Sequence, residues 1–430
     1  MTTTQRLRTV RFVMLVLAAS GIAVAQPHSQ DTGHGGLQRK PYEFGGYVET
    51  KFTHYRLNRN SALYNVEFAD QPQRATLDRA GATLRLTGSA RADEWQFRFQ
   101  SRSTVEHDQL ARDTVNRFDE LAASWKPRPD FSLDAGKMVL KWGKGHSWNP
   151  VAFVERPKDA SDPRLPREGY TLISATVNRH FTGALKSVTF NPLLLPVSEN
   201  LNHDFGKPGH LNAAAKLHLD FGDTEGGFYF LNNGSRAGRA GLDFSHDITN
   251  DLEIYGEWAR IKAQSFRLTT PAGVSYTRTE AATSYLAGMR YRTQQRSHFI
   301  FELHHNGTGF SADEFRDFVA LVDNAAQAGV GSALMGRAQK LADGGFGRQK
   351  AMQNYLYFRA SQAAVPVAPS IRLTVNLQDG SYSIAPELLY NVRSHWGVRA
   401  RFTVLGGGAA SEYGAKYYSR RAELRLHYHF

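Results

Sequence analysis

Basic side chains recur at alternate positions along many strand-like segments of this chain. Because successive side chains of a strand point to opposite faces, these cations share one face and apolar side chains occupy the other. If the apolar faces are turned outward, the polar faces enclose a water-filled interior, where rows of arginine attract anions. The predicted basic lining consists of Arg85, Arg98, Arg102, Lys216, Arg239, Arg290, Arg359, Arg372, Arg399, Arg401 and Arg425.

Carboxylates stand among these cations, and Glu387 and Glu423 fall on the same polar faces. Two interpretations therefore stay open for the arginines. Either they are solvated and set up a positive field, or they pair with carboxylates across the wall and hold it together. The two interpretations are compatible, because a polar interior needs charge for its hydration in either case.

The segment 141–163 is the densest special sequence, with two tryptophans, several basic residues and glycines. It predicts a loop that folds inward and narrows the enclosed space. Trp142 and Trp148 are suited to stacking on sugars or aromatic solutes, and the alternative is a packed loop that they anchor to the wall. The residues of the predicted constriction are Lys141, Trp142, Lys144, His146, Trp148 and Arg156.

The same loop places His146, Ser147 and Asn149 together, which are residue types used by outer-membrane phospholipases. Neighbours in a loop do not make a catalytic triad by spacing alone. His304 and His305 are adjacent, so a strand directs them to opposite sides and they make a poor metal pair. The chain has no cysteine, no phosphate-binding loop and no dinucleotide fingerprint. We therefore expect no enzyme activity, no cofactor and no metal.

Strand-like runs follow one another from residue 43 to the carboxy-terminus, and we count 18, with 16 as the alternative. Long connections (58–76, 104–117, 141–169, 194–210, 264–280, 306–352 and 406–417) mostly alternate with short ones. Short turns at one end and long loops at the other are the arrangement of a transmembrane β-barrel. The pattern predicts an all-β, antiparallel barrel with short periplasmic turns and long outer loops.

The last ten residues alternate strictly between apolar and charged side chains and end on Tyr428 and Phe430. This ending resembles the closing strand of bacterial outer-membrane barrels, whose final Phe is read by the assembly machinery. The resemblance implies that Tyr428 and Phe430 form an assembly signal. The whole pattern is similar to substrate-specific, porin-like and alginate-export-like channels of about 18 strands, which implies a Gram-negative outer membrane.

Residues 1–25 resemble a secretory signal, with Arg6, Arg8 and Arg11 before a short apolar run and Ala23-Val24-Ala25 as the cleavage site. The predicted organisation is a signal peptide over 1–25, a periplasmic tail over 26–41 and a barrel over 42–430. The formal net charge is +12. Nucleic-acid binding is excluded because the basic residues alternate along strands and form no block.

The connection 306–352 contains Phe315, Phe318 and Val322 at helical spacing, and Ser311 with Glu314 resembles a capping box. We expect a short helical lid over the mouth. The predicted function is passive diffusion of small hydrophilic solutes, with a preference for anions. The expected partners are outer-membrane lipid and the barrel-assembly machinery, and the oligomeric state stays open. The alternatives are a barrel whose loops bind a partner or surface, and a lipid-acting barrel enzyme.

Overall fold

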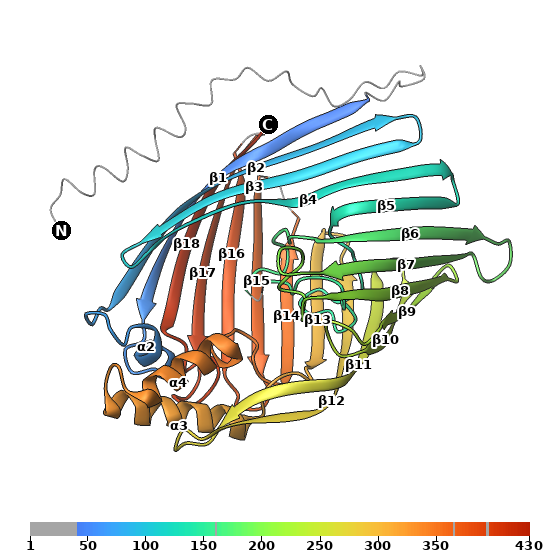
Figure 1. Ribbon diagram of the computed structural model, residues 1–430. Coiled ribbons are helices and arrows are strands. Elements are labelled where there is room, and N and C mark those ends of the chain that lie inside the picture. The colour runs from blue at the N-terminus through green and yellow to red at the C-terminus, as the bar shows by residue number, and fades with distance from the viewer. Residues whose placement is uncertain (1–40, 160, 364–365, 393–394) are drawn as a thin grey trace.

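The computed structural model describes residues 41–159, 161–363, 366–392 and 395–430, so the expected signal peptide and nearly all of the tail lie outside the described residues. Eighteen antiparallel strands form one sheet in which each strand pairs with the next and β18 pairs with β1 (Figure 1). The predicted closed barrel of 18 strands is confirmed. The strands are β1 (Tyr42–Leu57), β2 (Thr76–Ala92), β3 (Trp95–Asp108), β4 (Arg112–Arg128), β5 (Phe131–Met138), β6 (Tyr170–His180), β7 (Ser187–Val197), β8 (His210–Asp220), β9 (Thr224–Leu231), β10 (Arg239–Thr249), β11 (Leu252–Thr269), β12 (Ser275–Arg292), β13 (Ser297–His305), β14 (Asn354–Gln362), β15 (Val367–Asn376), β16 (Tyr382–Asn391), β17 (Trp396–Gly406) and β18 (Tyr418–His429).

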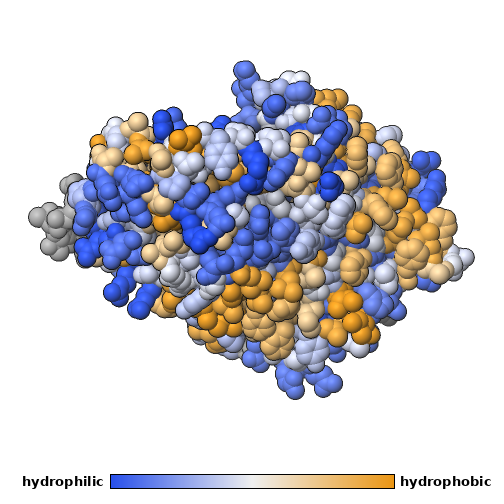
Figure 2. Space-filling view, turned by 90° about the horizontal axis from the view of Figure 1, so that it is seen from below, coloured by the Kyte–Doolittle hydropathy of each residue, from blue (hydrophilic) through white to orange (hydrophobic). Residues whose placement is uncertain are grey.

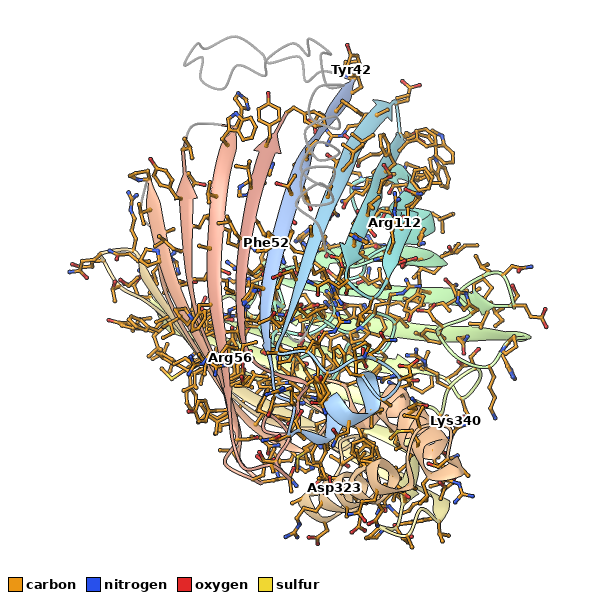
Figure 3. The ribbon with its side chains drawn as sticks, turned by 90° about the vertical axis from the view of Figure 1, so that its left-hand side faces the viewer. Tyr42, Phe52, Arg56, Arg112, Asp323 and Lys340 are labelled. Atoms are coloured by element: carbon orange, nitrogen blue, oxygen red, sulfur yellow. The ribbon has the colours of Figure 1, made fainter. Side chains whose placement is uncertain are left out.

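The alternation of side chains decides which face of the sheet is turned outward. On β18, Leu424 and Leu426 are exposed, whereas Glu423 and Arg425 are buried inside the barrel. Phe52 likewise lies on the outer wall of β1 (Figure 3). An apolar outer band and a polar interior suit a sheet that is surrounded by hydrocarbon, where no backbone edge can be left open. No helix among the described residues has the length and apolar character of a membrane-spanning helix.

Short turns and the carboxy-terminus gather at the end of the barrel that Tyr42 marks, and the helices gather at the opposite end with Asp323 and Lys340 (Figures 1 and 3). Two connections at the helical end are shorter than expected. The segments 104–117 and 264–280 were predicted as long loops, but only 109–111 and 270–274 are outside strands. At β3, β4 and β12 the strands continue with mostly polar residues on both faces, whereas at β11 the inward side chains, Phe266 and Leu268, are apolar and pack under the lid. The pattern of a strand in the bilayer, apolar outward and polar inward, is therefore missing.

A lid covers part of the helical end and is formed by α2 (Ala62–Glu67), α3 (Ala312–Ala328), α4 (Ala333–Leu341) and the π-turn η1 (Ala342–Phe346). The predicted capping box is present at the start of α3, where the Ser311 side chain accepts from the Glu314 backbone N–H. Phe315 and Phe318 of α3 are fully buried against α2 and the outer ends of β11 and β14. Seen from the helical end of the barrel, hydrophilic residues occupy the centre of the surface, and hydrophobic residues gather toward its rim (Figure 2).

Candidate functional site

The connection between β5 and β6 folds into the barrel and contacts strands on the far side of it. We call its described residues, 139–159 and 161–169, the inner strap. Its Lys144 and Gly145 backbone N–H groups donate to Oε1 of Glu257 on β11, each at 2.6 Å. The Ser147 N–H donates to Oε2 of Glu302 on β13 at 2.8 Å. The strap thus runs along the inner wall and is held there by two buried carboxylates.

A glycine permits the closest of these approaches. Gly143 has φ +84°, and a Cβ atom at this position would lie 2.6 Å from Oε1 of Glu257. Any side chain here would displace the carboxylate that accepts the strap's N–H groups, and the backbone conformation also favours glycine. The glycines of this segment therefore serve close packing of the strap on the wall.

Both tryptophans of the strap pack on the wall. Trp142 is buried against Phe153 and Tyr229. The Trp148 ring stacks on the His304 ring, with 4.9 Å between the two ring centroids. The Nζ atom of Lys350 lies 4.5 Å from the centroid of the Trp148 ring. This arrangement corresponds to the anchoring interpretation of the tryptophans rather than to free stacking platforms for a solute.

The His-Ser-Asn sequence of the strap is not arranged as a triad. Ser147 Oγ accepts from the Nζ of Lys350 at 2.6 Å, and its backbone N–H is taken by Glu302. Burial, together with the charges of Arg359 and Lys158, lowers the pKa of His146 to about 3. In the described part of the chain there is also no group of three His, Cys, Asp or Glu residues placed to hold a metal ion.

The tip of the strap reaches the basic cluster of β15–β18. Oδ2 of Asp162 lies 2.5 Å from Arg401 and 3.1 Å from Arg399. Although burial opposes it, the charge of Arg401, followed by those of Arg164 and Arg372, holds the pKa of Asp162 well below its usual range. The predicted anion-attracting patch is therefore occupied by a carboxylate of the protein itself.

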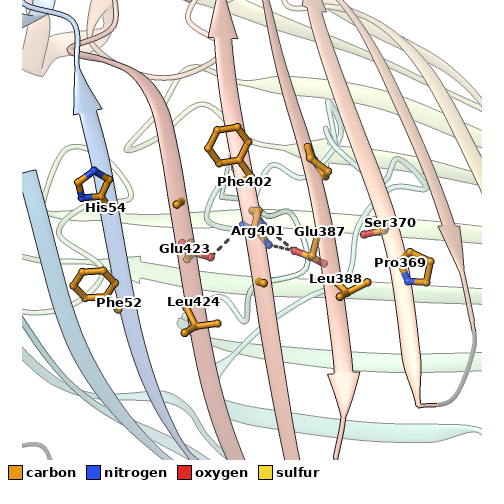
Figure 4. A pocket seen from close by; sticks show the side chains of 13 residues that line it. Phe52, His54, Pro369, Ser370, Glu387, Leu388, Arg401, Phe402, Glu423 and Leu424 are labelled. Carbon is orange, nitrogen blue, oxygen red and sulfur yellow. Dashed lines mark hydrogen bonds and ion pairs between the residues drawn. The ribbon is translucent and has the colours of Figure 1, made fainter. Parts of the chain in front are cut away.

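Wall carboxylates complete this pairing. Arg401 also donates to Glu387 and lies 3.6 Å from Glu423 (Figure 4), and only 1% of its side chain is exposed. Arg425 pairs with Glu423 at 3.0 Å and with Glu49 at 3.2 Å. Among the described residues, five guanidiniums thus share four carboxylates, namely Arg164, Arg372, Arg399, Arg401 and Arg425 with Asp162, Glu387, Glu423 and Glu49.

A second basic cluster lies on β2, β3 and β4. Arg85 pairs in register with Arg102, and Arg102 with Arg117, so that the three form one row across the inner wall. They surround the fully buried Asp119 at 3.8, 2.7 and 3.2 Å respectively. A β-bulge between β3 and β4 turns both Asp119 and the following Glu120 inward. We call Arg85, Arg102 and Arg117 the arginine row.

Arg102 and Arg117 of the arginine row keep contact with open space, whereas Arg85 is buried. The side chains of Arg117 and Arg102 are 37% and 21% exposed, and that of Lys51 on β1 is 23% exposed. Tyr229, Glu257 and Glu302, which face the strap, are buried. Open space therefore reaches the inner wall at β1, β3 and β4.

The remaining predicted lining residues are spread along the wall, and most have a partner. Arg98 pairs with Asp134, Arg290 with Glu253, and the Lys216 Nζ lies 5.6 Å from the Tyr229 ring centroid. Arg239 and Arg359 form no ion pair with any described residue. On the strap, Lys144 pairs with Glu225, Arg156 with Asp204, and Lys141 is exposed.

The chain ends on a paired strand. Phe430 exchanges two backbone hydrogen bonds with Gly46 of β1, at 3.0 and 3.1 Å, and the Tyr428 ring lies 4.8 Å from that of Trp396. Arg117 and Asp119 were not among the predicted site residues. Arg117 lay in a segment expected to be a loop. The β-bulge that turns Asp119 inward is not indicated by the alternation of apolar and polar residues in the sequence.

The comparisons with known proteins agree with this architecture. A family model described as "Phosphate-selective porin O and P" matches residues 50–184, which include β2–β5 and the inner strap. No curated protein matches the sequence.

Solved structures of similar shape are outer-membrane barrels. OccK5 (OpdH) of Pseudomonas aeruginosa has a TM-score of 0.52 at 12% identity, covering 90% of this chain and 97% of its own. OccK11 (OpdR) of the same organism has a TM-score of 0.50 at 11% identity, covering 90% and 95%. Wzi of Escherichia coli, described as a carbohydrate-binding β-barrel involved in group 1 capsule assembly, has a TM-score of 0.53 at 12% identity, covering 89% and 83%. The chain has the fold of a porin-like outer-membrane β-barrel.

Proposed function

We propose that the protein is an outer-membrane channel for passive diffusion of small hydrophilic solutes, with a preference for anions. The observation that carries this proposal is that charged side chains of both signs on the inner wall of β1, β3 and β4 remain exposed to solvent. A strand wall lined by solvated charges provides a path for hydrated solutes through hydrocarbon. The porin-like fold and the family model support a channel.

The preference for anions rests on the arginine row. Three guanidiniums surround the single carboxylate of Asp119. Arg117 additionally shares Glu168 with Lys137. Positive charge therefore exceeds negative charge at this level of the wall. The field acts on a passing ion only if the passage is not much wider than the screening length, about 8 Å at physiological salt.

The arginines of β15–β18 are paired with carboxylates, so they are a weaker basis for anion selectivity than the sequence predicted. Arg401 is enclosed by Asp162, Glu387 and Glu423 and has almost no contact with solvent. Replacing it would loosen the strap instead of changing the field in an open passage. The row on β2–β4 is thus the better target for a test of selectivity.

The test is the reversal potential of single channels in a salt gradient, with Arg102 and Arg117 replaced together by Gln. We expect the reversal potential to move toward cation preference, by an amount that shrinks as salt rises. Arg112→Gln is the matched control, because Arg112 is exposed at the outer end of the same strand. An unchanged reversal potential at low salt in the double variant would remove the anion preference from the proposal.

The covered mouth supports a second candidate, a barrel whose outer surface binds a partner. The lid builds its own hydrophobic core over the helical end, and charged residues such as Asp313, Arg316 and Asp323 remain exposed on α3. Wzi, which is similar in fold, is described as binding carbohydrate. Bilayer recordings separate the two candidates, because a purely binding barrel shows no conductance with or without the lid.

A further inference from the structure

A small cavity lies between the tip of the inner strap and the wall of β14–β18, and its volume is about 30 Å³. The strap contributes Ser161 and Pro163, and the segment after the lid contributes Gln349. Arg372 of β15 and Arg421 of β18 line it from the wall. The strap therefore forms part of the cavity wall.

The two arginines belong to one row of the sheet, with small residues between them. Arg372 pairs in register with Ala385 of β16, and Thr403 of β17 pairs with Arg421. Ala385 is too short to fill the space that larger neighbours would occupy, which leaves room between the two guanidiniums. The strand pattern thus builds the cavity into the wall and does not leave it to a flexible loop.

Several buried hydrogen-bond donors at this cavity have no partner. Nε of Arg372, Nε of Arg421, the hydroxyl of Tyr357 and the hydroxyl of Thr403 form no hydrogen bond with any described residue. Arg421 is 9% exposed, and no carboxylate of the described chain lies within ion-pair distance of it. A buried charge without a counter-charge is costly, so an occupant that supplies one is favoured.

The chemistry of the donors defines the occupant. Arginine offers donors and no acceptor, and a hydroxyl can turn its proton toward an anion. No carboxylate lines the cavity in the described part of the chain, which disfavours a cation. A water molecule would have to place its own two protons as well as accept. A small anion in the cavity accepts from donors of this kind and compensates the charge of Arg421.

Size narrows the class further. The cavity volume of about 30 Å³ exceeds the roughly 10–15 Å³ that a single water molecule requires. Chloride and bromide, which consist of one atom, are the simplest anions that fit. We propose that the cavity between Arg372 and Arg421 is a binding site for one halide ion, which clamps the tip of the inner strap to the wall. This goes beyond the proposed function, because it concerns a fixed ion and not the passing solute.

The test uses the full-length barrel folded in detergent, with bromide titrated against gluconate at constant ionic strength. A ligand that binds only the folded state raises the unfolding temperature in a saturable way. We expect this saturable rise in the natural protein and its loss in Arg421→Gln. Arg420→Gln is the matched control, because Arg420 is the exposed neighbour on the same strand and should keep the rise.

Two further measurements keep the proposal open to refutation if Arg421→Gln folds poorly. Thr403→Val keeps the shape of the side chain and removes one donor, so bromide should bind more weakly and saturate at higher concentration. Crystals soaked in bromide should show an anomalous peak between Arg372 and Arg421. A rise that does not saturate, equal saturation by phosphate, or an ordered water at this position in bromide would each overturn the proposal. None of these readouts depends on conductance, so they fail independently of the proposed channel.

Discussion

Oδ2 of Asp162, at the tip of the inner strap, accepts a hydrogen bond from Arg401 of β17 at 2.5 Å, across 239 residues of sequence. Both side chains are 1% exposed. The strap begins at β5 and is fixed here to the opposite part of the wall. We therefore predict that this buried ion pair, which belongs to no local sequence pattern, helps to set the width of the passage.

Replacing Asp162 by Asn should release the strap. Breaking a buried pair leaves Arg401 with less counter-charge, which costs about 3–5 kcal/mol. We expect a larger single-channel conductance and a lower unfolding temperature, the latter visible as earlier loss of the fast-migrating band on gels. Glu199→Gln, an exposed acid in the connection from β7 to β8, is the control. Natural conductance in D162N would show that the strap does not limit the passage.

The carboxylate of Glu302 should hold the first part of the strap against the wall, and we call this contact the latch. It accepts from the backbone N–H groups of His146 and Ser147 and from the hydroxyl of Tyr255. Glu302→Gln places an amide N–H against one of these donors and leaves it unsatisfied, at a cost of about 1–3 kcal/mol.

We expect Glu302→Gln to increase the fluctuation of the open-channel current, because the strap visits detached positions more often. Glu280→Gln, on the exposed outer part of β12, removes a carboxylate without touching the strap and should leave the current noise unchanged. Equal noise in the two variants would argue against the latch.

The barrel could be predicted from the sequence because the bilayer imposes the pattern. Within hydrocarbon every second side chain must be apolar, so β18 was recognised from its alternation alone. The rule ends where the strands leave the bilayer. The outer ends of β4 and β12 carry mostly polar residues on both faces, and that of β11 turns Phe266 and Leu268 inward against the lid, so the sequence predicted loops there.

The lining was predictable only in part for a related reason. The alternation of side chains along a strand identifies Arg401 as an inward-facing residue, but it does not identify the carboxylate that pairs with Arg401. Asp162 approaches from a strap that is distant in sequence, and Asp119 faces inward because a bulge shifts the parity of β4. Tertiary contacts therefore decide whether a cluster of arginines is free or paired with carboxylates. The periodicity of the sequence does not show these contacts.

Deletion of Phe430 should lower the yield in the outer membrane more than it lowers stability. The residue closes the barrel through two backbone hydrogen bonds to Gly46, and its side chain contributes about 1–3 kcal/mol by burial. We expect a sharp loss of folded protein in cells, with nearly natural unfolding of protein refolded in detergent. Leu424→Ala removes a comparable apolar group from the same strand and controls for lost contact. Normal cellular yield after the deletion would contradict an assembly role.

Selectivity should also depend on pH through two half-buried lysines. Burial lowers the pKa of Lys158 on the strap and of Lys350 beside it to about 8, although the charge of Glu302 opposes both shifts. Both ammonium groups are charged below this pH and neutral above it. The anion preference should therefore fall between about pH 7 and about pH 9, and Lys158→Met with Lys350→Met should abolish this step in the reversal potential.

Stability should change in the opposite sense over a higher window. The ordinary lysine pKa is 10.5, so between about pH 8 and 10.5 the unfolded chain holds more protons at these sites than the folded barrel. Unfolding then becomes less favourable as pH rises, because the folded state no longer buries the charge. The double Met variant should lack this rise in unfolding temperature. A selectivity step that persists in that variant would assign the titration to other groups.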